Sequence, residues 1–184
     1  MFTQRLGVYI FLGFLTLSVA YKISPIIVQD GIPDFLNVTT DPFVKIGNGY
    51  YFIQINSTKN WHAAYESCRK MNASLVNFES IEEWNLINNY LNDTGIHTKY
   101  WTSGTVLADT VERNHVWFST GQAMSLDIWY PGEPNNLGGS EYCDEMGRYD
   151  VPVLFWGLND RNCNTILPYI CKAQQPATVS FLVW

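Results

Sequence analysis

Three observations in the sequence predict an α+β fold. Two segments with helical periodicity, residues 61–71 and 81–91, lie in the first half of the chain. After Tyr100 this periodicity ends, and strand-length runs alternate with glycines, single tryptophans and polar loops. Four cysteines, an even number, indicate two disulfides if the chain is secreted. The predicted architecture is therefore two helices followed by loop-rich antiparallel sheets.

The N-terminus indicates secretion. The sequence MFTQRLGVYIFLGFLTLSVA has a lone Arg5 before an apolar run of 14 residues, Gly7 to Ala20. This run has the length of a signal-peptide core and is shorter than the ~20 residues that a spanning helix needs. We expect residues 1–20 to be a signal peptide, with a signal anchor as the alternative. Residues 21–42 then form an arm, residues 43–173 the domain, and residues 174–184 a tail too short to span a bilayer.

The charge balance narrows the class of partner. The chain has 184 residues, 11 basic against 17 acidic, and a net charge of −6. Removal of residues 1–20 takes away one arginine and no acid, which leaves −7. Such a charge argues against nucleic acid or an anionic membrane as the main partner and suits a protein that collects cations. Passage through the secretory route is also indicated by sequons at Asn37, Asn56, Asn72 and Asn92.

The cysteines allow more than one arrangement. Cys68, Cys143, Cys163 and Cys171 could pair in three ways. No CxxC pair is present and the three histidines are scattered, so a zinc site is not expected.

Local patterns predict the elements in order. FVKIGNGYYFIQI indicates two strands around a Gly47-Asn48-Gly49 turn. The first helix is expected to bury one face, made of Trp61, Ala64, Tyr65, Cys68 and Met71. A capping box at residues 80–83 opens the second helix, whose core-facing residues are expected to be Ile81, Trp84, Ile87 and Leu91.

The second half of the chain is expected to hold short strands and buried aromatic residues. Strands are predicted at residues 100–103, 115–119, 141–146 and 169–172. The core is expected to include Trp61, Trp84, Trp101, Trp117 and Trp156. Trp129 and Tyr130 are candidates for ligand contact, and one of Asp144 and Glu145 is expected to face solvent.

Oxygen-bearing side chains gather around the long stretch between residues 126 and 140. Glu133, Asn135 and Glu141 lie within nine residues, and Asn159-Asp160 follow later. If Cys143 pairs with Cys163, the bridge would hold Asn159-Asp160 beside Glu141. Carboxylates and amides without imidazole or thiolate favour Ca²⁺. A cis Glu133–Pro134 bond would turn the flanking side chains toward one point; an acidic surface loop with a trans proline is the alternative.

The chain resembles the C-type lectin family over residues 44–172. The resemblance is carried by the cysteine order, by Glu133-Pro134-Asn135, by Glu141 and by Asn159-Asp160. The spacing and the Tyr-Pro-Gly lead-in are most similar to small secreted insect lectins. The resemblance implies the C-type lectin fold with two disulfides, Cys68–Cys171 and Cys143–Cys163.

The same resemblance implies a function. It assigns the calcium and sugar ligands to Glu133, Asn135, Glu141, Asn159 and Asp160. Carboxylates accept hydrogen bonds from two vicinal sugar hydroxyls and amides donate to them; the Glu-Pro-Asn order favours the equatorial hydroxyls of mannose, fucose or N-acetylglucosamine. The implied partners are glycans or glycoproteins, cell-surface or microbial, and self-association is possible.

Two departures from the family pattern concern packing and a second ion. Leu158 stands where the family usually has tryptophan, and Trp156 could fill part of that volume. Asp109 and Glu112 are out of register for an auxiliary calcium, which is not expected.

Two other functions compete with sugar binding. A module that binds protein, ice or mineral with a vestigial calcium site is one alternative. A glycosidase using Glu133 and Glu141 is the other, but no catalytic motif supports an enzyme.

Overall fold

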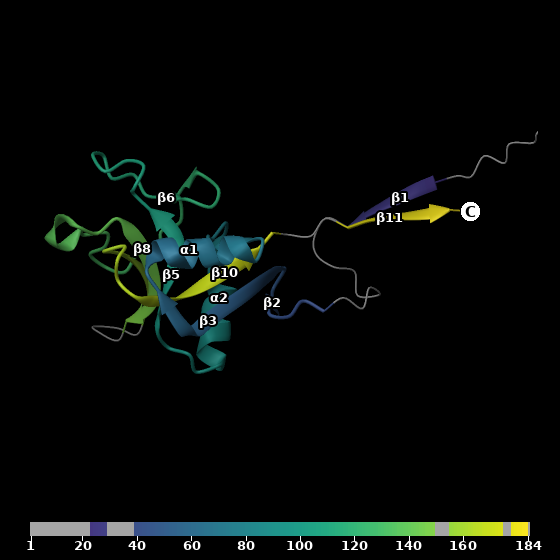
Figure 1. Cartoon of the computed structure of the whole chain (residues 1–184), viewed down its shortest axis with the longest axis horizontal. Helices are drawn as coiled ribbons and strands as arrows, with labels where there is room; N and C mark the ends of the chain where they lie inside the picture. The colour runs from purple at the N-terminus through teal and green to yellow at the C-terminus, as the bar shows by residue number, and fades with distance from the viewer. Residues whose placement is uncertain (1–22, 29–38, 150–154, 175–177, 184) are drawn as a thin grey trace, which may run out of the picture. The chain divides into compact units, whose positions relative to one another are not determined.

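The computed structural model describes residues 23–28, 39–149, 155–174 and 178–183 (Figure 1). The predicted signal peptide and Asn37 lie outside the described residues. The described part contains two helices, α1 and α2, with bounds Trp61–Lys70 and Ile81–Asp93. No helix in this part is long and apolar enough to cross a membrane.

The strands of the domain form one nine-stranded sheet. Two further strands, one near each end of the chain, pair with each other in a separate sheet. The central order is β2-β3-β10-β5-β6-β7, with β4 against β10 and β8 between β5 and β9. The separate two-stranded sheet consists of β1 (Ile23–Val28) and β11 (Thr178–Val183). The nine strands are β2 (Val44–Ile46), β3 (Gly49–Lys59), β4 (Ala73–Leu75), β5 (Lys99–Thr105), β6 (Val116–Trp117), β7 (Gln122–Ala123), β8 (Cys143–Tyr149), β9 (Phe155–Arg161) and β10 (Leu167–Ala173).

The predicted hairpin is confirmed. β2 pairs with β3 antiparallel, and Ile46 faces Gly49 across the turn. Gly47 has φ +57°, a left-handed conformation that glycine adopts without the strain a side chain would add. The four strands predicted after Tyr100 correspond to β5, β6, β8 and β10, whereas β1, β4, β7, β9 and β11 were not predicted. β9 pairs with β8, and its polar Asn-Asp-Arg end hides the period of a strand.

Both helices begin with a side-chain cap, of which the one on α2 was predicted from the sequence. Asn60 Oδ1 accepts a hydrogen bond from the N–H of Ala63 at the start of α1. Ser80 Oγ accepts one from the N–H of Glu83, at 3.1 Å, at the start of α2. The return bond comes one residue earlier than a capping box requires, because Glu83 Oε2 accepts from the N–H of Glu79. These bonds satisfy donors that a helix N-terminus otherwise leaves without partners.

The buried face of α2 is narrower than predicted. Trp84, Ile87 and Leu91 are buried, but Ile81 is 52% exposed, so its assignment to the core was wrong. Ile81 is the first residue of the helix and lies at the margin of its apolar stripe. On α1, Trp61, Ala64 and Cys68 are buried as predicted, and Tyr65 and Met71 are partly buried and pack against the same core.

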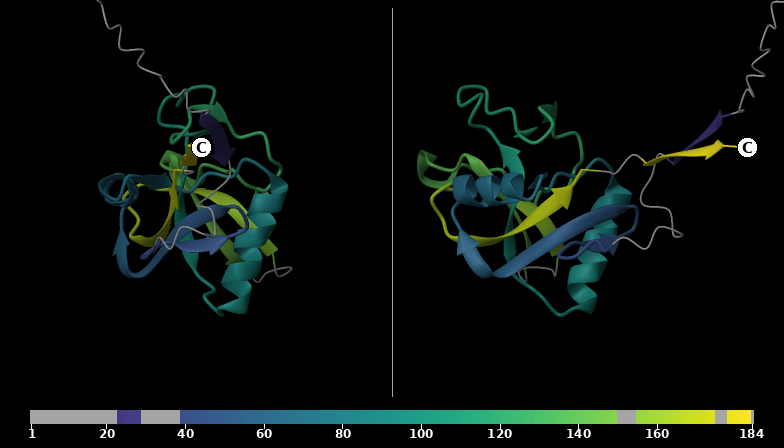
Figure 2. Two further views of the ribbon diagram at one scale, coloured as in Figure 1. Left: turned by 90° about the vertical axis from the view of Figure 1, so that its right-hand side faces the viewer. Right: turned by 45° about the vertical axis from the view of Figure 1, so that its right-hand side comes forward.

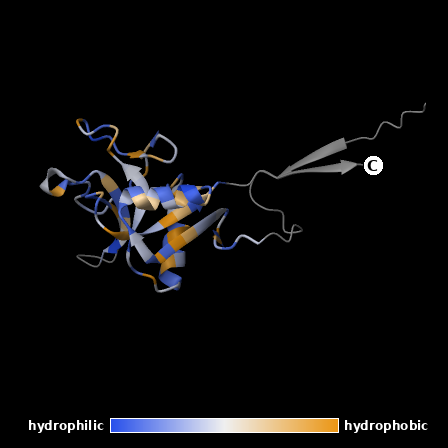
Figure 3. Cartoon of the chain, viewed as in Figure 1, coloured by the Kyte–Doolittle hydropathy of each residue, from blue (hydrophilic) through white to orange (hydrophobic). Residues whose placement is uncertain are grey.

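The sheet separates two cores. α1 packs in a cluster with Trp101 and the disulfides, and α2 packs in a cluster with Tyr100. β3 and β10 run between the two helices in both views of Figure 2. Adjacent residues of a strand point to opposite faces, which is why β5 contributes Tyr100 to one core and Trp101 to the other. In Figure 3, hydrophobic segments lie among the central strands and on α2, and shorter ones lie in the outer loops.

Both disulfides have the pairing that the resemblance implied. Cys68–Cys171 ties α1 to β10, and Cys143–Cys163 ties the start of β8 to the segment after β9. Four of the five tryptophans assigned to the core are buried: Trp61, Trp84, Trp101 and Trp117. Trp156 is only partly buried and packs at the edge of the α2 core beside the fully buried Leu158.

Candidate functional site

The long loop between β7 and β8 has its own local structure. The Glu133–Pro134 peptide bond is cis, as predicted. The N–H of Glu133 donates to the carbonyl of Tyr130, at 2.9 Å, and a short 3-10 turn covers Leu137–Gly139. Asn136, just before that turn, has φ +49°, a conformation that asparagine tolerates better than most residues. The segment is therefore a folded loop with defined side-chain directions.

Asp160 on β9 anchors this loop. Its side chain is fully buried, and its two oxygens accept the backbone N–H groups of Asn135 and Asn136, each at 2.9 Å. Oδ2 also accepts from the guanidinium of Arg113, at 2.8 Å. Three charge-assisted hydrogen bonds thus hold one carboxylate and bring residues 113, 135 and 160 together.

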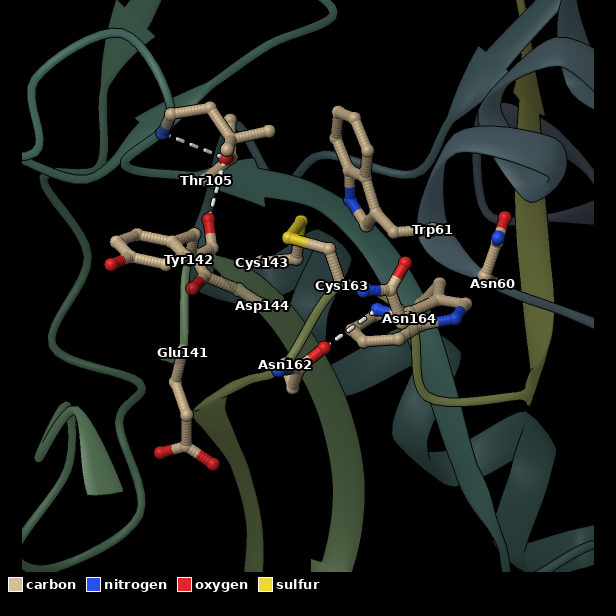
Figure 4. Close-up of a disulfide and its surroundings, with 12 residues drawn as sticks. Asn60, Trp61, Thr105, Glu141, Tyr142, Cys143, Asp144, Asn162, Cys163 and Asn164 are labelled. Atoms are coloured by element: carbon tan, nitrogen blue, oxygen red, sulfur yellow. Dashed lines mark hydrogen bonds between the residues drawn. A yellow bond between two sulfur atoms is a disulfide. The ribbon is translucent and has the colours of Figure 1, made fainter. Parts of the chain in front are cut away.

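Glu141 closes the loop from the other end. Its Oε2 accepts from the N–H of Leu137, at 2.8 Å, and its own N–H donates to Asn136 Oδ1. Its carbonyl accepts from Arg113. In Figure 4, Glu141 precedes the Cys143–Cys163 disulfide and its carboxylate points away from the sulfur atoms. The bridge therefore keeps the strand in place while the acid faces the loop.

Glu133 and Asn135 lie against each other at the rim. Asn135 Nδ2 donates to Glu133 Oε1, at 2.8 Å, which turns the amide oxygen away from that carboxylate. Glu133 Oε2 is buried and has no hydrogen-bond partner. Burial, and then the charge of Asp160, raises the pKa of Glu133 above its usual range.

The pKa of Glu141 is raised in the same direction. Burial is the largest cause, and the charge of Asp160 adds to it, while the N–H of Leu137 opposes it. The carboxylates of Glu133, Glu141 and Asp160 thus repel one another, and a cation between them would relieve this repulsion.

Asn159 faces a second network on the neighbouring strand. Its Nδ2 donates to Oε1 of Glu145, at 3.2 Å. That oxygen also accepts from Arg161 and Tyr149, and it forms an ion pair with Lys99. Because the amide nitrogen is held by Glu145, the amide oxygen of Asn159 points elsewhere.

The expectation for Asp144 and Glu145 was wrong. Both side chains are fully buried, because β8 lies between β5 and β9 and both of its faces are covered. Asp144 Oδ2 lies 2.9 Å from His115 Nδ1, and burial raises the pKa of Asp144 to about 6 against the opposing effect of His115. Trp129 packs edge-on against His115, with ring centroids 4.7 Å apart, so this candidate for sugar contact is engaged in packing.

Arg113 is a site residue that sequence reasoning missed. It follows a turn in which Asp109 Oδ1 accepts from the N–H of Glu112 and Oδ2 accepts from Asn114 Nδ2. Arg113 itself has φ +54°, and its side chain is 22% exposed. Asp109, weighed as a ligand for a second ion, instead uses both oxygens within this turn. The sequence does show that Arg113 is the one basic side chain among the acids of residues 107–114. It contains no pattern that would pair residue 113 with residue 160.

The residues fit a calcium ion in their chemistry. Among the described residues, no three His, Cys, Asp or Glu side chains converge closely enough to hold a metal by themselves. A cage at this place needs the amides as well as the acids, which is a donor set that suits calcium. The buried, unpartnered Oε2 of Glu133 supplies a free acceptor for it. The candidate ligands remain Glu133, Asn135, Glu141, Asn159 and Asp160.

Comparison with known proteins identifies the family. The family model for the lectin C-type domain matches residues 57–173. The chain belongs to the C-type lectin family. It is 40% identical to C-type lectin 37Da of Drosophila melanogaster over 162 residues, which covers 85% of each chain. This family is a carbohydrate-binding, non-catalytic class, and nothing shows enzymatic activity in this member.

Two solved structures show the same fold. The carbohydrate-recognition domain of the mouse scavenger receptor C-type lectin has a TM-score of 0.62 and 20% identity, covering 76% of this chain and 100% of that domain. A complex of SPL-1 with GlcNAc has a TM-score of 0.60 and 25% identity, covering 73% of this chain and 93% of that one. The C-type lectin fold predicted from the sequence is confirmed.

Proposed function

We propose that this C-type lectin binds mannose-, fucose- or N-acetylglucosamine-type sugars in a calcium-dependent manner. The observation that carries the proposal is the unpartnered Oε2 of Glu133 in a loop tied to Asp160 and Glu141. A buried carboxylate oxygen without a donor is costly, and a cation offsets that cost.

In this proposal the carboxylates and the amides have different roles in binding a sugar. Carboxylates of Glu133 and Glu141 accept hydrogen bonds from two vicinal hydroxyls, and amides of Asn135 and Asn159 donate to the same hydroxyls. Calcium, when bound, supplies the positive charge to which both hydroxyl oxygens are attracted. Asp160 holds the loop through the N–H groups of residues 135 and 136. The order of acid, proline and amide matches equatorial 3- and 4-hydroxyls.

Affinity for a single sugar should be weak. Glu133 and Asn135 lie at the surface, so much of a bound sugar stays in water, and immobilising it costs entropy. Useful binding to cell-surface or microbial glycoproteins then requires several sites acting together. Association of copies of the chain would supply them.

Secretion is part of the proposal. Residues 1–20 act as a signal peptide, and the mature chain carries N-glycans on some of its four sequons. Asn56, Asn72 and Asn92 are exposed, as an acceptor asparagine must be. Mass spectrometry of the secreted protein, before and after enzymatic removal of N-glycans, would show the first residue and the occupied sequons.

A glycan array, read with calcium and then with a chelator, tests the binding proposal. We expect signals on mannose-, fucose- or N-acetylglucosamine-terminated glycans that disappear with the chelator and return when calcium is restored. Binding to a protein ligand that ignores the chelator, with no glycan signal, would instead support a module whose calcium site is vestigial.

A further inference from the structure

Two cations share one buried carboxylate next to Asn159. Glu145 on β8 is fully buried, and its Oε1 accepts from Arg161 Nη2 at 2.9 Å and lies 3.3 Å from Lys99 Nζ. The hydroxyl of Tyr149 donates to the same oxygen at 3.0 Å. One negative charge therefore faces two positive charges within the cluster, and the carboxylate of Glu141 also acts on Arg161 from outside it.

Both cations extend from the interior to solvent. The side chains of Lys99 and Arg161 are 34% and 31% exposed, whereas that of Glu145 is 0% exposed. Lys99 Nζ lies 4.4 Å from the centre of the Tyr149 ring, which limits where the ammonium can move. An ammonium has three N–H donors and a guanidinium five, so each retains donors beyond the one directed at Glu145. Arg161 Nε itself is buried and has no hydrogen-bond partner.

The cluster adjoins the proposed sugar ligands. Asn159 Nδ2 donates to the same Oε1, at 3.2 Å, so it lies within two hydrogen-bond lengths of both cationic groups. Arg161 also follows Asp160 directly in β9. A sugar whose hydroxyls contact Asn159 would place its neighbouring substituents near Lys99 and Arg161.

We propose that Lys99 and Arg161 form an anion-binding subsite of the sugar site. The subsite would take an anionic substituent, a sulfate ester, a phosphate ester or a carboxylate, on the bound sugar or on the residue linked to it. The inference rests on the proposed sugar-binding function and specifies its ligand class as acidic glycans. The acidic chain disfavours anions at long range, so discrimination comes from these two local donors, whose hydrogen bonds to an anion are charge-assisted.

Paired ligands of one sugar test the subsite. Titrations with calcium present would compare N-acetylglucosamine with its 6-sulfate, mannose with mannose 6-phosphate, and glucose with glucuronic acid. We expect the wild-type protein to bind at least one anionic member about fivefold more tightly than its neutral partner at low salt. The preference should shrink as salt is added, because both cations are partly exposed. The three pairs distinguish sulfate, phosphate and carboxylate.

Lys99→Gln is the informative variant. Arg161 still neutralises Glu145 in this variant, so the domain should fold. The preference for the anionic ligand should fall to about onefold, while affinity for the neutral sugar changes less than twofold. Lys70→Gln removes the same charge from an exposed residue that pairs with Glu66 on α1, and it should keep the preference. Arg161→Lys should keep part of it, since the charge remains.

Three results would contradict this inference. Equal affinity for both members of every pair in the wild-type protein would overturn it, as would a preference that survives Lys99→Gln. An equal loss for neutral and anionic ligands in Lys99→Gln would mean that the lysine only supports Glu145. Failure of the wild-type protein to bind any neutral sugar, while folded and with calcium, would instead refute the proposed function and the subsite with it.

Discussion

Two groups of carboxylates lie side by side in this domain and are neutralised differently. Asp144 and Glu145 on β8 are fully buried, and each meets nitrogen-bearing side chains: His115 for the first, Lys99 and Arg161 for the second. In the loop group, Glu133, Glu141 and Asp160 lie near enough to repel one another, and Asp160 forms an ion pair with Arg113.

This difference in neutralisation distinguishes carboxylates that contribute to stability from carboxylates that are candidates for ligand binding. Each strand carboxylate is paired through one oxygen with a nitrogen-bearing side chain, while its other oxygen, Asp144 Oδ1 or Glu145 Oε2, has no hydrogen-bond partner. In the loop group, Glu133 and Glu141 have raised pKa values, and Glu133 Oε2 has no partner. We therefore assign the ion-paired strand acids to the support of the fold and, under the proposed function, the loop acids to an external cation. Four predictions test this division.

The largest expected effect is on the strand group. Glu145→Gln leaves Lys99 and Arg161 beside a neutral amide and should lower the free energy of unfolding by about 2–3 kcal/mol, less than a fully buried pair because both cations are partly exposed. The loss should be the same with calcium or chelator. The matched change in the loop, Glu133→Gln, should leave stability in chelator unchanged or slightly higher, because it removes repulsion. Urea unfolding curves measure the free energy of unfolding of both variants. Equal decreases in the two variants would contradict the distinction between strand and loop carboxylates.

The second prediction concerns what the loop group recognises. In the double variant Glu133→Gln and Asn135→Asp, the acid and the amide exchange places and total charge is unchanged. Calcium affinity should fall modestly, while affinity for mannose should fall about tenfold or more, because donors then face donors. Galactose gains at best weak binding. Inhibition of column binding by mannose and galactose, at saturating calcium, measures this; an unchanged preference for mannose would show that residues 133–135 do not contact the sugar.

The third prediction concerns whether the guanidinium of Arg113 partly substitutes for a bound calcium ion in neutralising the loop carboxylates. Arg113→Met removes the guanidinium from Asp160 and from the carbonyl of Glu141, so stability in chelator should fall by about 1–2 kcal/mol. The rise in melting temperature on adding calcium should become larger, because repulsion among the acids is then less relieved. Lys70→Gln serves as the control for loss of a surface charge. A smaller calcium-induced rise would mean that Arg113 shapes the cage and does not share its charge.

The smallest and most gradual effect is that of pH. Glu133 and Glu141 must be ionised to hold a cation, and their folded pKa values are raised above the usual 4.5. Protons therefore compete with calcium at a higher pH than for an ordinary glutamate, so retention on a sugar column should decline as pH falls from neutral through mildly acidic buffers. Excess calcium should partly restore it. Retention that is constant over this range would show that these two carboxyls do not bind the ion.

The sequence by itself determined most of the architecture. Helical spacing located α1, spacing and a predicted cap located α2, the Gly47-Asn48-Gly49 turn located the first hairpin, and the family resemblance correctly paired the four cysteines. These features succeed because they depend on neighbours within a few residues or on a pattern spread over the whole domain. The five candidate ligands were also named from the sequence, and they stay a proposal.

Only the tertiary structure decided which polar groups meet. Ile81 follows the helical pattern, yet it is exposed, whereas Glu83 in the same turn is contacted by Tyr51 of β3 and Lys172 of β10. Asp144 and Glu145 alternate along β8, yet both are buried, because β5 and β9 flank the strand and both faces are covered. Arg113 reaches Asp160, and Lys99 reaches Glu145, across 47 and 46 positions of the chain. Periodicity reports one face of one element, whereas burial and ion pairing depend on what the other elements place against it.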